Sequence, residues 1–181
     1  MNTRREFLKK SLLYGAAIII PSKASAKLRH ERRLRLYHIH TGESIDTVFW
    51  ANGEYIYDEL RQLEHFLRDY RTNQMHKIDV RLFEYLHGIS RLLGTKEHFY
   101  VISAYRSPRT NELLRRHNRG VAKKSYHTQG KAVDIRLPRH SLIGLKEVAL
   151  ALKMGGVGYY PRSNFVHIDT GTPRYWRYPK R

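Results

Sequence analysis

The sequence contains no cysteine, few acidic residues and no apolar run of the roughly 20 residues that a membrane-spanning helix needs. The absence of cysteine excludes disulfides, cysteine-ligated zinc fingers and a cysteine nucleophile. Only 16 aspartates and glutamates stand against 34 lysines and arginines in 181 residues, so the formal net charge at pH 7 is +18. This charge predicts an anionic partner or neighbourhood. The length favours one domain with its own core.

The first 26 residues have the pattern of an export signal. Residues 3–9 are charged, residues 12–20 are largely apolar, and Ala-Ser-Ala at residues 24–26 is a small-x-small cleavage site. Paired arginines before Phe-Leu-Lys are typical of a twin-arginine signal, whose route exports folded proteins. We expect residues 1–26 to direct export to the periplasm and to leave no stable membrane span after cleavage. A basic amphipathic membrane anchor is the alternative.

The rest of the chain divides into a basic, flexible lead-in at residues 27–33 and one domain at residues 34–181. Most of the positive charge follows residue 26, so it belongs to the exported domain. The sequence has no helix-turn-helix or RNA-binding signature, and nucleic acid is therefore not expected as a partner. We expect the exported domain to lie next to the anionic cell wall. We also expect it to be a monomer. Two alternatives remain, a solvated basic face without a specific partner and a protein that binds nucleic acid or anionic lipid.

Hydrophobic periodicity predicts an α+β fold, with helices packed on a small antiparallel sheet in a single domain. Strand patterns cover residues 34–40, 45–51, 54–57, 98–103, 131–137, 157–160 and 165–169. Helical patterns cover residues 58–70, 79–93, 111–116 and 141–154. Asn52-Gly53 predicts a tight hairpin, because both turn positions need a positive φ.

Two histidines and one aspartate offer a ligand set for a metal. His127 and Asp134 are seven residues apart, and His167 comes from the last expected hairpin. Two imidazoles and a carboxylate with an open fourth position suit a catalytic zinc. From the spacing alone, a surface histidine and a buried structural aspartate are as probable as a metal site. His38 and His40 share a strand face without an evident third ligand, which favours a structural pair.

Several motifs resemble one enzyme family. The pattern S-x-H-x-x-G-x-A-x-D at residues 125–134, preceded by S-x-Y-R-S at residues 103–107, resembles the LAS-type zinc D,D-peptidases. That family includes D-Ala-D-Ala carboxypeptidases, the dipeptidase VanX and phage endolysins. Residues 40–44, 120–127 and 155–169 make the chain similar to the murein endopeptidases of this type. The resemblance implies an exported zinc peptidase that cuts the peptide cross-links of peptidoglycan. A carboxypeptidase acting on the same peptide stems and a non-catalytic peptidoglycan-binding module are the alternatives.

The resemblance also implies roles for individual residues. His127, Asp134 and His167 match the ligands of one zinc ion per chain. Arg106 matches an arginine that stabilises the oxyanion beside the scissile carbonyl; a salt bridge within the fold is its alternative role. Ser125 matches a residue that lines the substrate cleft.

The chain departs from the family pattern at the general base. Relatives usually place an acid or histidine two or three residues before the last zinc ligand, where this chain has Phe165 and Asn164. Strand alternation puts Asp169 on the same face as His167. We therefore expect Asp169 to be either the base or the acceptor of the second imidazole N–H. Tyr160, just before this strand, is a candidate to donate its hydroxyl to the tetrahedral intermediate.

Overall fold

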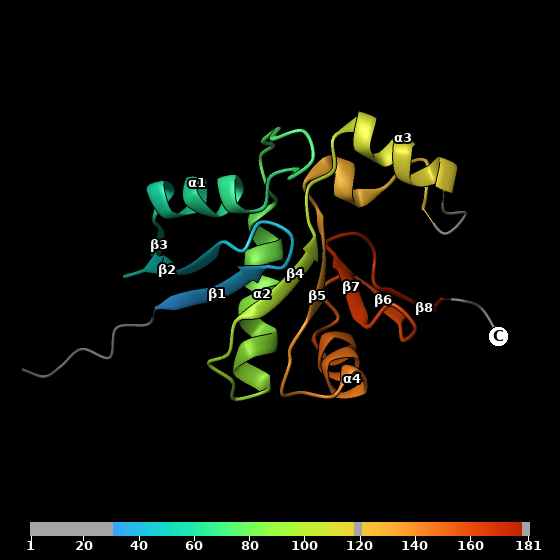
Figure 1. The fold of residues 1–181 in the computed structure, drawn as a ribbon. Coiled ribbons are helices and arrows are strands. Elements are labelled where there is room, and N and C mark those ends of the chain that lie inside the picture. Colours follow the sequence, from blue (N-terminus) through green and yellow to red (C-terminus); the bar gives the residue numbers. More distant parts are fainter. Residues whose placement is uncertain (1–30, 118–120, 179–181) are drawn as a thin grey trace, which may run out of the picture.

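The computed structural model describes residues 31–117 and 121–178, so the expected signal and the lead-in up to residue 30 lie outside the described residues. The described chain forms an α+β fold with one eight-stranded sheet (Figure 1). Its strands are β1 (Arg32–His38), β2 (Ser44–Ala51), β3 (Glu54–Tyr55), β4 (Phe99–Ser103), β5 (Ala132–Arg136), β6 (Gly156–Tyr160), β7 (Phe165–Asp169) and β8 (Arg174–Arg177). Its helices are α1 (Tyr57–Phe66), α2 (Val80–Leu92), α3 (Pro108–His117), the 3-10 helix η2 (Tyr126–Gln129) and α4 (Leu142–Leu152). None of these helices has the length and apolar character needed to cross a membrane.

The sheet is mixed, with the strand order β3-β2-β1-β4-β5-β7-β6-β8. The hairpin between β2 and β3 is confirmed, because Asn52 and Gly53 have φ values of 55° and 95°. The α+β class is also confirmed, but the sheet is larger than expected and not wholly antiparallel. β1 runs parallel to β4, and β6 runs parallel to β8. The long connection through α1 and α2 allows the first of these parallel pairs, since parallel neighbours need a crossover.

The hydrophobic core lies between the sheet and the helices α2 and α4. α2 begins after Asp79, whose carboxylate accepts a hydrogen bond from the Arg81 amide as an N-cap. Apolar side chains of α2, including Phe83 and Leu86, are fully buried. The Tyr85 hydroxyl donates to the Ala149 carbonyl of α4 at 2.8 Å. These contacts give the central strands a rigid support.

Among the segments that differ from the sequence expectations are α1, the C-terminal tail and β1. α1 ends at Phe66 instead of residue 70, because the buried Asp69 forms a closed turn in which the Asn73 amide donates to the Asp69 carbonyl. The C-terminal tail contains β8, which pairs in parallel with β6. No local sequence pattern predicts this pairing. β1 begins at Arg32, inside the expected lead-in.

Gly130 is required where η2 meets the segment before α2. Its φ is +65°, and a Cβ atom there would lie 2.2 Å from the Lys77 carbonyl oxygen. The Asp79 amide donates to the Gly130 carbonyl at 2.9 Å, so the two segments cannot separate without losing this bond. Gly42 also has a positive φ, +74°, but no atom lies within 4 Å of its Cβ position.

These two glycines make a matched test. We expect Gly42→Ala to lower the free energy of unfolding by about 1–2 kcal/mol, the cost of a left-handed L-residue. Gly130→Ala should cost at least about 2 kcal/mol more, because the backbone must also move away from Lys77. Urea unfolding of both variants measures the difference. Equal losses would contradict the close approach.

Candidate metal centre

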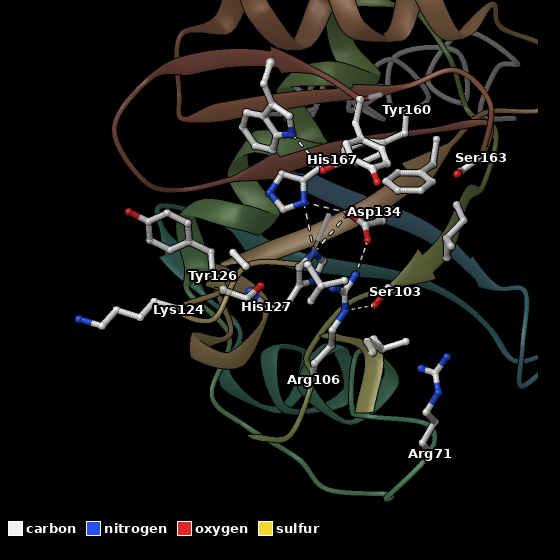
Figure 2. A pocket seen from close by; sticks show the side chains of 18 of the residues that line it. Arg71, Ser103, Arg106, Lys124, Tyr126, His127, Asp134, Tyr160, Ser163 and His167 are labelled. Carbon is white, nitrogen blue, oxygen red and sulfur yellow. Dashed lines mark hydrogen bonds and ion pairs between the residues drawn. The ribbon is translucent and has the colours of Figure 1, made fainter. Parts of the chain in front are cut away.

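The register of two central strands brings Asp134 and His167 together. β5 and β7 are antiparallel neighbours, and Asp134 lies directly opposite His167. His127 arrives from η2, where the Ser125 hydroxyl accepts a hydrogen bond from the His127 amide. The left-handed Gly130 then ends η2 and leads the chain into β5. All three side chains point toward one another in Figure 2, and one ligand atom from each lies within 4.8 Å of the others.

The distances within this group are short and similar. His127 Nε2 lies 3.2 Å from His167 Nδ1 and 3.3 Å from Asp134 Oδ1. His167 Nδ1 lies 2.9 Å from the same Asp134 oxygen. Ligand atoms about 2.0–2.1 Å from a tetrahedral zinc are separated by about 3.3 Å, so the group has the dimensions of such a site.

Hydrogen bonds on the far side of each imidazole direct its lone pair into the group. His127 Nδ1 lies 2.7 Å from the Ala104 carbonyl oxygen, and His167 Nε2 lies 3.0 Å from Asp169 Oδ2. A neutral imidazole that donates through one nitrogen presents a lone pair at the other. When both rings are neutral, two imidazole lone pairs and a carboxylate oxygen therefore converge on one point. A metal cation satisfies all three, so the donor set fits a metal ion.

Burial and neighbouring groups shift the pKa of each member of the group. Burial lowers the pKa of His127 to about 4, which keeps the ring neutral at pH 7. Burial opposes ionisation of Asp134, but His127 and the Arg106 guanidinium outweigh it and hold the pKa of Asp134 well below its usual range. Burial also lowers the pKa of His167, but hydrogen bonds to Asp134 and Asp169 reverse this and raise it. Metal binding at His167 therefore competes with a proton.

Arg106 is tied to the same carboxylate from the other side. Its Nη2 donates to Asp134 Oδ2 at 2.6 Å, and its Nε donates to Ser103 Oγ at 2.8 Å. The salt bridge that the sequence left as an alternative is therefore present. It occupies the Asp134 oxygen that the imidazoles leave free, and the Arg106 side chain also lines the adjoining cavity (Figure 2).

Asp169 lies behind the His167 ring, away from the other two members of the group. Its side chain is fully buried, and Oδ2 accepts from His167 Nε2 and from Arg174 Nη2 at 2.7 Å. Oδ1 accepts from the amides of Gly156 and Gly171. Because the imidazole separates it from the cavity, Asp169 is positioned to orient the ring.

A cavity of about 410 Å³ opens beside the group. Ser125 and Tyr160, which the sequence placed at the substrate cleft, both line it. The Tyr160 hydroxyl accepts from Trp176 Nε1 at 3.0 Å, and its ring stacks on Phe165. Trp176 also lines the cavity, because the pairing of β8 with β6 brings it there.

The second histidine pair divides between core and cavity. His38 is buried, and His40 lines the cavity with its ring stacked on Tyr70. Within residues 31–117 and 121–178, the group of His127, Asp134 and His167 is the only one with metal-ligand spacing. Neither His38 nor His40 belongs to this group.

A His-Asp-His group with metal-ligand spacing, on a mixed sheet and beside an open cavity, fits a metal-dependent peptidase. The chain belongs to the peptidase family M15_2, described as peptidoglycan L,D-endopeptidase MepK, whose profile matches residues 25–176. It is 47% identical over 176 residues to the peptidoglycan L,D-endopeptidase MepK of Escherichia coli K12, covering 97% of each chain. It is 45% identical over 177 residues to a probable peptidoglycan L,D-endopeptidase MepK of Haemophilus influenzae, covering 96% of this chain and 95% of the relative. The expected family and the expected peptidase class are confirmed.

The buried aspartate predicts a specific acid response. Burial raises the pKa of Asp169, but hydrogen bonds from His167 and Arg174 outweigh burial and lower this pKa below its usual value. Its carboxylate therefore stabilises the fold above the ordinary aspartate pKa of about 3.9, and this stabilisation is lost as the pH falls below that value. Asp169→Asn should unfold about 1–3 kcal/mol more easily at pH 5 in metal-free protein, and the gap should narrow toward pH 2. Urea unfolding between pH 2 and 5 tests this, and a constant gap would contradict it.

Proposed function

We propose that the chain is an exported zinc-dependent L,D-endopeptidase that hydrolyses peptide cross-links of bacterial peptidoglycan. The observation that carries the proposal is the convergence of three lone pairs, from His127, Asp134 and His167, on one point beside an open cavity. The bond type follows the names of the relatives, which are L,D-endopeptidases of peptidoglycan. The substrate is then a peptide stem joined to a second stem.

Zinc is the ion that we assign to these ligands, one per chain. When bound to two imidazoles and a carboxylate, it lowers the pKa of a water molecule toward about 7 and polarises a carbonyl. The protein's part is to hold the three ligands in place. The Ala104 carbonyl orients His127, and the Asp169 carboxylate orients His167.

Arg106 and Tyr160 are proposed to stabilise the oxyanion. Arg106 places a fixed positive charge at the cavity wall next to the metal ligands. Tyr160 accepts from the Trp176 indole N–H, which can only donate, so its own proton remains available to a substrate oxygen. Burial raises the pKa of Tyr160, which keeps that proton on the hydroxyl at neutral pH. Ser125 is proposed to line the substrate cleft beside His127.

Asp169 is assigned to orientation of His167 and not to proton transfer. Its carboxylate faces the ring edge remote from Asp134 and is engaged by Arg174. Asp134 is the only carboxylate that lines the cavity within the described chain. The open cavity gives solvent access to the reacting groups, so the proton is proposed to leave to water.

The location is proposed from the N-terminal sequence. Residues 1–26, which lie outside the described residues, match a twin-arginine signal and would direct the folded domain to the periplasm. The basic lead-in would then precede a peptidase domain whose positive charge holds it near the anionic cell wall. We propose a monomer, since His127, Asp134 and His167 all come from one chain.

A digest of purified sacculi tests the activity. The zinc-loaded protein lacking residues 1–26 should convert cross-linked muropeptide dimers to monomers, with the cut bond identified by mass spectrometry. A chelator and His167→Ala should each abolish the conversion, because both remove the metal. Arg91→Gln, an exposed change on α2 away from the cavity, is the control. Release of terminal D-alanine alone would indicate a carboxypeptidase, and zinc binding without any product would indicate a binding module.

The role of Asp169 is tested by metal affinity. Asp169→Asn should weaken zinc binding about 10- to 100-fold, as loss of a ligand-orienting partner does, while turnover per bound zinc changes little. Arg174→Gln keeps the carboxylate and should have a smaller effect on zinc affinity. Zinc titration with a competing chelator and kinetics at saturating zinc separate the two quantities. Unchanged affinity with turnover nearly lost would instead make Asp169 the general base.

A further inference from the structure

The cavity beside the metal ligands is strongly basic. Four of its lining residues carry permanent positive charge, Arg71, Arg106, Lys124 and Arg174, and Asp134 is its one acid within the described chain. Arg106 and Arg174 are already paired with buried carboxylates. Among residues 31–117 and 121–178, the side chains of Arg71 and Lys124 form no ion pair, so the cavity has positive charge available for an anionic ligand.

The backbone of Arg71 is held firmly beside Arg106. Asp69 is 1% exposed, and its Oδ1 accepts from the Arg71 amide at 3.0 Å. The other oxygen of Asp69 accepts from the Ser107 amide at 2.9 Å. One buried carboxylate therefore links the turn that carries Arg71 to the residue that follows Arg106. This link explains why α1 stops early, because the turn is built around Asp69.

The Arg71 guanidinium is positioned by stacking. Its Cζ lies 4.3 Å from the centroid of the Tyr70 ring, and the His40 ring stacks on Tyr70 with centroids 4.4 Å apart. A guanidinium that packs its face on an aromatic ring keeps its in-plane N–H groups free to donate. Figure 2 shows Arg71 and Lys124 on opposite sides of Arg106 and the metal ligands. Only Arg71 has a planar donor fork that matches a carboxylate.

We propose that Arg71 is a specificity-determining residue that binds a free carboxylate of the substrate beside the scissile amide. This inference rests on the proposed function. In an L,D cross-link between two diamino dicarboxylic acids, the carbon attached to the scissile nitrogen carries a free carboxylate. A bidentate Arg71–carboxylate pair then positions this end of the amide next to Arg106 and the metal ligands.

Two cross-linked peptides with the same L,D bond test the proposal. One has this carboxylate free, and in the other it is converted to the uncharged amide. Wild-type protein should favour the free acid, and Arg71→Gln should lose about 10- to 100-fold in kcat/KM on that substrate, mainly through KM, with little change on the amide. Arg71→Lys should recover part of the loss, since it restores charge without the planar fork. Arg91→Gln, which removes an exposed arginine outside the cavity, should leave both rates unchanged.

The outcomes separate this inference from the proposed function. If wild-type protein cleaves neither peptide, the proposed function fails. If it cleaves both equally, or if Arg71→Gln slows both by the same factor, carboxylate recognition by Arg71 is overturned. Zinc content and the urea unfolding midpoint of each variant are measured alongside, so a loss confined to the acid substrate cannot come from a damaged site.

Discussion

The antiparallel register of β5 and β7 is the constraint on which the site depends. It sets Asp134 opposite His167, and a slip of one residue would turn either side chain to the other face of the sheet. Both strands lie in the middle of the eight-stranded sheet, supported by the packed core of α2 and α4. His127 then needs only a short 3-10 turn, ended by Gly130, to reach the same point. A precise arrangement of three ligand atoms is thus built mostly from regular structure.

Burial of these polar groups is tolerated because each has a partner. Asp134 is shared between the imidazoles and Arg106, and Asp169 between His167 and Arg174. An unpaired buried charge would be strongly destabilising. The same pairs orient the imidazoles and keep their lone pairs directed at one point. Stability and metal-binding geometry therefore rest on one network, so changes at its outer members affect both.

The positive charges of the cavity differ in their roles. Arg106 and Arg174 are engaged by buried carboxylates and belong to the network around the metal ligands. Arg71 is held by its backbone and by stacking on Tyr70, and its donor groups remain available. The net positive charge of the chain favours an anionic environment. Which cation can recognise a substrate group depends on whether its donors are already paired.

The sequence by itself predicted the α+β class, the Asn52-Gly53 hairpin, the start of α2 after Asp79 and the residues that gather at the metal centre. These features depend on local periodicity, turn chemistry or a family motif. Only the tertiary structure revealed the mixed sheet, the strand β8 with Trp176, and the side of His167 on which Asp169 lies. It also showed that Asp69 ends α1 and places Arg71 in the cavity. Strand pairing and buried hydrogen bonds join residues far apart in the chain, so their partners are decided by packing and not by neighbouring sequence.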